Sequence, residues 1–452
     1  MLMSSRKLGL FAFLLAVVAF TSVRAHAGAT LFLEEPYSVD GTFVGTGHTA
    51  VYLSRVCAQT PVVVRRCNPG EQGVVISRYH GVEGYDWLAI PLTAYLYAVD
   101  SPDKVPLFAD AKLEAFLRDR YRRTYLEAIV PDGKNGETPD GPWYQLVGSA
   151  YDRTLYAFQI ETPAEKDDEL IQIFNARRNA GLYKLLSANC ADFVKGIINF
   201  YYPGALHRSV IADLGVTTPK QIAKCLVHYS EHHPELQLTS YIIPQVPGTI
   251  KRSRPIRGVV ESAFKAKKYM VPLLAWHPVI VAGFAAAYFT GRGGFDPGHN
   301  ALVFNLDHDL QMPLSAEERR EYQKQLEKLG RGIAEDDAAL GLTKWSRVQS
   351  TAVPELDENG HPLFVLRERE DPVEIGLSRK NILSGSGSSE IARQMMLARL
   401  REELHKGEIK ISKSDVSADL QLLQELGKAD RERSATPAPG GGTGMETASK
   451  IR

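Results

Sequence analysis

The sequence lacks a net charge and lacks the motifs that mark several common enzyme classes. Its 53 Lys and Arg side chains balance 53 Asp and Glu side chains, which argues against a general polyanion binder such as a nucleic-acid protein. No GxSxG elbow, P-loop or strand-linked GxGxxG is present, and neither HExxH nor CxxC occurs. Four cysteines among 452 residues are too few for a disulfide-built scaffold. We therefore expect no cofactor, no metal and no nucleic-acid partner.

The charged side chains are unevenly distributed along the chain. Residues 301–452 carry 48 of the 106 charges in one third of the length. Within that part, 315–329 and 390–405 have the charge pattern of solvated helices or of a short coiled coil, so 300–428 is expected to be a charged helical region. The last segment, 429–452, includes a run of three glycines and is expected to be disordered. The chemistry is therefore to be sought in the first 300 residues.

The N-terminus has the pattern of an export signal. Arg6 and Lys7 precede an apolar run of 13 residues from Leu8 to Phe20. Ala25-His26-Ala27 then offers the small-x-small pattern of a cleavage site, which predicts a signal peptide over 1–27. The run is shorter than the ~20 residues that a membrane span needs. The protein is therefore expected to be exported to the periplasm or cell envelope.

The next part of the chain, 29–245, reads as one α+β domain. Residues 87–99 fit a strand, a sheet edge or a crossing segment. Strand candidates come first and helices gather after them, which is the order typical of an α+β fold. The expected strands are 29–34, the strand within 41–53, 62–66, 74–79 and 155–161, and the expected helices are 109–128, 164–180 and 190–201.

Residues 251–291 combine a basic linker with a hydrophobic segment. Seven basic side chains against one acid occupy 251–268, and no charged residue occurs in the 23 residues of 269–291. That length is enough to span a bilayer. However, Pro272, His277 and Pro278 interrupt it, and the basic block would lie on the exported side, against the positive-inside tendency. A membrane span, a buried hairpin and a segment lying on an anionic membrane surface all remain open.

Cys190 is the strongest candidate for chemistry. It follows Asn189 where a loop turns into an amphipathic helix. A thiol in the first turn of a helix is close to free backbone N–H groups and to the positive end of the helix dipole, and both favour the nucleophilic thiolate. The same N–H groups can stabilise an oxyanion. The alternatives are an ordinary buried cysteine and one half of a disulfide.

His48 is the candidate general base. It lies in Gly45-Thr46-Gly47-His48-Thr49, where two glycines precede a β-rich run. A histidine at the start of a strand is held on a rigid element, and a cysteine nucleophile needs such a base within hydrogen-bond reach. A single histidine on a strand is more often structural, so His48 is a candidate base only in combination with Cys190.

These two segments, 47–53 and 189–194, resemble those of the circularly permuted papain-like thiol hydrolases. That superfamily includes the permuted NlpC-type cell-wall peptidases and the lecithin:retinol acyltransferase-like enzymes. In its permuted members the histidine strand precedes the cysteine helix, as it does here. The resemblance covers about residues 29–205. It implies a small antiparallel sheet packed on the cysteine helix, Cys190 as nucleophile and His48 as general base.

The resemblance also implies a third polar residue, on the strand after the histidine strand, that orients the imidazole. His80 at the end of 74–80 is the preferred candidate and Ser77 is the second. The insertion that holds Cys57 and Cys67 lengthens the gap between the two strands and departs from the family pattern.

The remaining cysteines and a histidine cluster allow alternative readings. Cys57 and Cys67 suit a hairpin disulfide in an exported protein, whereas pairing of Cys190 with Cys225 would remove the nucleophile. A metal set is also conceivable, but histidine-rich helix ends are usually solvated, so no metal is expected there. Its members would be Cys225, His228 and His232 at i, i+3 and i+7, with Glu231 and His233 beside them.

The sequence thus predicts an exported cysteine hydrolase or acyltransferase. The expected substrate is an amide or ester of an envelope peptide or a lipid, and 251–291 offers a contact to an anionic membrane surface. Two alternatives remain: a catalytically inactive binding module of the same fold, and a membrane-tethered scaffold. The substrate, the oligomeric state and the role of 300–452 stay open.

Overall fold

The computed structural model describes residues 28–37, 46–181, 183–209, 215–265, 295–304, 350–367 and 372–384, with a few single positions elsewhere. The expected signal peptide, the expected helices at 315–329 and 390–405 and the tail at 429–452 lie almost entirely outside the described residues, as does most of 269–291. The described part is a mixed α+β structure, as the sequence predicts.

A seven-stranded sheet forms the centre of the molecule, in the order β6-β5-β2-β1-β7-β8-β9. Neighbouring strands are antiparallel except for β8 and β9, which are parallel. A short hairpin beside it pairs β3 (Val56–Thr60) with β4 (Val63–Arg66). The strands of the main sheet are β1 (Ala29–Glu34), β2 (His48–Leu53), β5 (Val74–Val82), β6 (Tyr85–Pro91), β7 (Leu155–Ile160), β8 (Thr239–Ile243) and β9 (Leu302–Val303).

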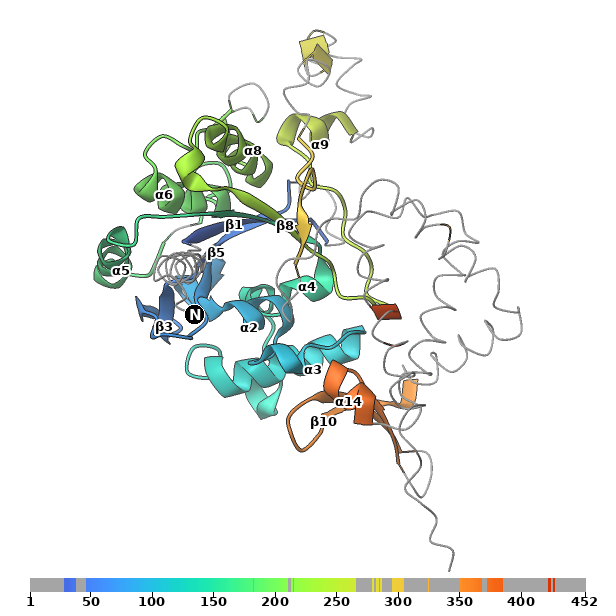
Figure 1. Cartoon of the computed structure of the whole chain (residues 1–452). Helices are drawn as coiled ribbons and strands as arrows, with labels where there is room; N and C mark the ends of the chain where they lie inside the picture. Colours follow the sequence, from blue (N-terminus) through green and yellow to red (C-terminus); the bar gives the residue numbers. More distant parts are fainter. Residues whose placement is uncertain are drawn as a thin grey trace, which may run out of the picture.

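Helices cover both faces of this sheet, and each face has its own hydrophobic core (Figure 1). One core includes side chains of α2 (Leu92–Tyr97), α3 (Ala111–Tyr121) and α4 (Ser149–Asp152). The other includes side chains of α5 (Lys166–Ala176), α6 (Cys190–Tyr201) and α8 (Pro219–Ser230). The shorter elements are η2 (Pro102–Lys104), η3 (Arg122–Leu126), η4 (Lys134–Gly136), η5 (Pro142–Leu146), η6 (Pro234–Leu236) and α9 (Val259–Lys265).

The central position of β1 explains its composition. It lies between β2 and β7, so both of its faces are buried and its sequence is an almost unbroken apolar run. Glu34 at its end is its one charged residue, and it pairs in register with His48 at the start of β2. Gly47 makes this approach possible, because its φ is +68° and an added Cβ would lie 2.1 Å from the Glu34 carbonyl oxygen.

A second sheet is formed by residues that the sequence suggested only as part of a charged region. Its strands β10 (Val353–Leu356), β11 (Pro362–Leu366) and β12 (Val373–Gly376) pair antiparallel and are followed by α14 (Arg379–Ser384). Phe364 and Ile375 join the same core as α2 and α3, so this sheet packs on the front domain.

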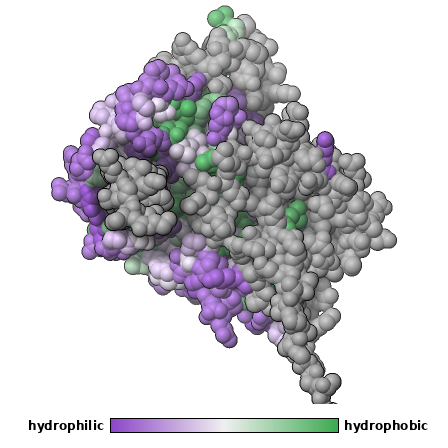
Figure 2. All heavy atoms as spheres, in the orientation of Figure 1, coloured by the Kyte–Doolittle hydropathy of each residue, from purple (hydrophilic) through white to green (hydrophobic). Residues whose placement is uncertain are grey.

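The surface of the described residues is mainly hydrophilic on the face drawn in Figure 2, where hydrophobic residues form only small patches. Among the helices of the described residues, none is both long and apolar enough to cross a bilayer.

Candidate active site

Cys190 is the first residue of α6, and the preceding asparagine fixes this helix start. Asn189 Oδ1 accepts a hydrogen bond from the backbone N–H of Asp192 at 2.9 Å, which is an N-cap interaction. Its Nδ2 donates to the carbonyl oxygens of Leu185 and Thr217, each at 2.9 Å. Asn189 therefore ties together the loop before α6, the helix itself and the segment before α8.

The thiol of Cys190 is buried and lies against β2. Burial raises the pKa of this thiol to about 12, while a hydrogen bond from the backbone N–H of Thr49 acts in the opposite direction. The nearby Glu34 carboxylate raises the pKa further, and the N–H groups of Ala191 and Cys190 lower it. The thiol is thus neutral at rest, and it contacts the residue that directly follows His48.

His48 is held by β5. Its Nε2 lies 2.6 Å from Ser77 Oγ, and the Ser77 hydroxyl donates to the Thr49 carbonyl oxygen at 2.8 Å. Because this hydroxyl has a single proton, the proton of the His48–Ser77 hydrogen bond comes from Nε2, and Nδ1 keeps the lone pair. The imidazole also stacks on Tyr79, with ring centroids 4.3 Å apart.

The environment of His48 favours the neutral imidazole. Burial lowers its pKa well below 6.5, and the positive charge of Arg153 lowers it further. A neutral imidazole with its proton on Nε2 offers Nδ1 as the basic nitrogen. His48 is therefore in the protonation state that a general base requires.

Ser77 occupies the place where a third residue orients the imidazole. It was the second candidate from the sequence, after His80. His80 also belongs to β5, but its side chain lies outside the described residues. Register explains the position of Ser77, because Val51 pairs with Ile76 and the next residue of β5 therefore lies beside the start of β2.

A buried ion pair beside His48 was not anticipated from the sequence. Arg153 Nη1 lies 3.0 Å from Glu34 Oε2, with 3% and 0% of the two side chains exposed. The Tyr95 hydroxyl donates to Glu34 Oε1, and the Ser149 hydroxyl donates to Glu34 Oε2 at 3.1 Å. The only sequence signal was an acid at the end of a strand that is otherwise apolar.

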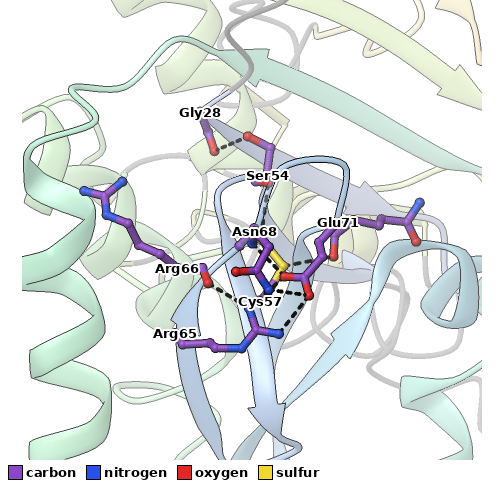
Figure 3. The surroundings of a disulfide bond; sticks show 9 residues. Gly28, Ser54, Cys57, Arg65, Arg66, Asn68 and Glu71 are labelled. Atoms are coloured by element: carbon purple, nitrogen blue, oxygen red, sulfur yellow. Dashed lines mark hydrogen bonds and ion pairs between the residues drawn. A yellow bond between two sulfur atoms is a disulfide. The ribbon is translucent and has the colours of Figure 1, made fainter.

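The cysteine pairing keeps the candidate nucleophile free. Cys57 and Cys67 form a disulfide that closes the β3–β4 hairpin, which confirms the predicted pairing (Figure 3). Beside it, Arg65 binds the Glu71 carboxylate through two nitrogens at 2.7 and 2.9 Å. Cys190 and Cys225 are both unpaired and buried, so the competing disulfide between them is not formed.

Helical spacing allows a metal set of Cys225, His228 and His232, and the structure separates the cysteine from the two histidines. Cys225 Sγ lies 3.6 Å from His207 Nε2 and accepts a hydrogen bond from Gln221 Nε2 at 3.1 Å. It is thus turned toward the protein interior, whereas His228 and His232 are exposed at the end of α8. Cys225 therefore does not belong with these two histidines, a grouping that the sequence allowed but did not favour.

Comparison with known proteins gave no matching family model and no significant similarity to a curated protein or a solved structure.

Proposed function

We propose that this protein is an exported cysteine hydrolase or acyltransferase of the permuted papain-like type, with Cys190 as nucleophile and His48 as general base. The observation that carries the proposal is the contact between Cys190 and β2. Two segments 142 residues apart meet, because α6 packs on β2 and the thiol lies close to the backbone N–H of Thr49, the residue after His48. The proposed location is the periplasm or cell envelope.

The first chemical step follows from the protonation states. Because both groups are neutral at rest, the thiol attacks the substrate carbonyl while its proton passes to Nδ1 of His48. The oxyanion that forms on the carbonyl oxygen is stabilised by backbone N–H groups at the start of α6. The tetrahedral intermediate then expels the amine or alcohol, which takes the proton from His48, and a thioester on Cys190 remains.

The second step releases the acyl group. Water, or a second amine or alcohol, gives a proton to His48 and attacks the thioester carbonyl, and the Cys190 thiolate leaves and recovers that proton. Ser77 keeps Nε2 protonated through both steps by accepting its hydrogen bond at 2.6 Å. The substrate class that suits this chemistry is an envelope peptide amide or a lipid ester.

One observation favours the alternative of an inactive binding module. Ala50, which shares its face of β2 with His48, belongs to the core on the α2 and α3 side, whereas Val51, Ala191 and Val194 form the core on the α6 side. The His48 imidazole and the Cys190 thiol therefore start on opposite faces of the sheet. Contact between them requires the two side chains to approach each other around the end of β2. A binding module would tolerate that arrangement together with the raised pKa of Cys190.

Covalent trapping distinguishes the two functions. The purified protein is treated with p-nitrophenyl acyl esters and with acylated peptides, and the acyl adduct is located by peptide mass spectrometry. We expect one adduct on Cys190, with turnover abolished by Cys190→Ala and strongly reduced by His48→Ala. Cys225→Ala is the matched control, because Cys225 is the other buried free thiol, and this variant should keep full turnover.

Two results would overturn the enzyme assignment. Turnover by Cys190→Ala equal to that of the unmodified protein would remove the nucleophile. Absence of any adduct on Cys190 across esters and amides would favour the binding module. Circular dichroism of each variant shows that a loss of turnover is not a loss of fold.

A further inference from the structure

The end of α8 carries a His-x-x-Glu-His sequence, His228 to His232, that the proposed function does not use. His228 is in the last turn of α8, and the turn that follows the helix brings the His232 imidazole and the Glu231 carboxylate beside it. This spacing is the one by which helices of the H-x-x-E-H type present two histidine ligands to zinc. The three residues are all exposed.

The distances within this cluster suit one metal ion. One donor atom from each of His228, Glu231 and His232 lies within 4.8 Å of the others. The two imidazole centroids are 5.4 Å apart. With Zn–N bonds of about 2.0–2.1 Å, two imidazoles at a tetrahedral zinc ion have centroids roughly 5 Å apart. The rings are therefore already close to the separation that a shared ion requires.

Both imidazoles have one ring nitrogen engaged with an acceptor. His228 Nδ1 lies 2.9 Å from Glu231 Oε2, and His232 Nδ1 lies 3.4 Å from the His228 carbonyl oxygen. A proton on each Nδ1 leaves the lone pair on each Nε2. Metal-bound histidines typically donate their other N–H to a carboxylate or a carbonyl oxygen, and this is the arrangement here.

We propose that His228 and His232 bind a divalent ion of the zinc class through their Nε2 atoms. Glu231 orients His228 and supplies negative charge beside the cation. The other coordination positions are open to water or to a group from a second molecule. The site involves neither Cys190 nor His48, so it stands or falls independently of the proposed enzyme activity.

The neighbouring histidine provides a matched control. His233 stacks on Tyr229 with ring centroids 3.8 Å apart, and its Nδ1 lies 2.8 Å from Glu235 Oε1. It is thus held away from the other two rings by its own partners. His233→Ala removes an imidazole from the same turn and leaves the proposed ligands in place.

Isothermal titration of the EDTA-treated full chain with Zn²⁺ tests the site. We expect saturable binding that the double variant His228→Ala/His232→Ala abolishes and that His233→Ala leaves unchanged. Glu231→Gln should weaken binding about tenfold, the effect of losing an outer hydrogen-bond partner of a metal ligand. Because these side chains are exposed, the variants are expected to keep their circular dichroism spectra.

Equal affinity and stoichiometry in the double variant and the unmodified chain would overturn the site, since the metal would then bind elsewhere. Absence of saturable binding by the unmodified chain would overturn it as well. Neither result depends on whether Cys190 forms an acyl adduct.

Discussion

Arg153→Met should destabilise the protein strongly at neutral pH. Arg153 is the ion partner of Glu34, and both side chains are almost completely inaccessible to solvent. Methionine keeps much of the length of the arginine side chain but removes its charge. The Glu34 carboxylate would then be buried beside only the hydroxyl groups of Tyr95 and Ser149. Removing one partner of a buried ion pair costs about 3–5 kcal/mol, because the remaining charge is uncompensated.

The loss should depend on pH. Burial already raises the pKa of Glu34 above 4.5, and Arg153 is the largest cause that lowers it. Without Arg153 the folded-state pKa of Glu34 rises further. In the folded variant Glu34 then binds its proton more tightly than in the unfolded chain, so protonation of Glu34 stabilises the folded state. This stabilisation is complete below pH 4.5 and is lost as the pH rises through the folded-state pKa. The deficit of Arg153→Met should therefore be larger at pH 7.5 than at pH 5.

Urea unfolding followed by tryptophan fluorescence measures this effect at both pH values. The double variant Arg153→Met/Glu34→Gln should recover a large part of the loss, because a neutral amide still accepts hydrogen bonds from Tyr95 and Ser149. Arg65→Met is the control: its partner Glu71 is at the surface, and little change is expected. An Arg153→Met deficit below about 1 kcal/mol at pH 7.5, equal at pH 5, would refute the buried-charge argument.

Three further predictions concern the site and the hairpin. Because the pKa of His48 is well below 6.5, chiefly through burial, the acidic limb of kcat/KM should lie below pH 6.5; a pH–rate profile that falls already above pH 6.5 would contradict this. Ser77→Ala should lower kcat roughly 10- to 100-fold by freeing the imidazole, and a larger loss in His80→Ala would restore His80 as the third residue. Replacing Cys57 and Cys67 by serine should lower the free energy of unfolding by about 3 kcal/mol, because the disulfide no longer restricts the entropy of the unfolded chain by closing a short loop. Equal urea midpoints of the variant and the unmodified protein would refute this prediction.

Local signals explain why part of the fold was predictable from the sequence. The apolar run that forms β1 has the predicted bounds, because a central strand is buried on both faces and needs no alternation. The start of α6 was equally predictable, since an amphipathic pattern begins at Cys190; the structure adds that Asn189 caps this helix. Such signals lie within a few residues of the elements that they define.

The second sheet shows where local signals fail. Residues 353–376 lie in a highly charged part of the chain, and their strands are short. Phe364 is buried because it meets the core formed by α2 and α3, more than 240 residues earlier in the chain. Strand formation there depends on the surface formed by α2 and α3, which is too far away in the sequence for a local pattern to reveal.

The choice between His80 and Ser77 also depends on tertiary structure. His80 was the preferred candidate because it closes the expected strand 74–80. Which residue of β5 reaches the imidazole is decided by the register between β2 and β5, and a shift by one residue would exchange the two faces of the strand. The sequence therefore pointed to the strand that contacts the imidazole, without giving the register.

The buried pair of Glu34 and Arg153 connects stability to chemistry. Arg153 offsets the cost of burying Glu34, and its positive charge is the second cause that keeps the pKa of His48 low. Removing either partner is unfavourable, because the other charge stays buried without its counter-ion: the Glu34 carboxylate in the absence of Arg153, or the Arg153 guanidinium in the absence of Glu34. Glu34 pairs in register with His48. The positive charge of Arg153, which compensates the buried Glu34 carboxylate, therefore also helps to keep the adjacent His48 imidazole neutral. The proposed general base thus depends on an ion pair that a search for catalytic motifs would not find.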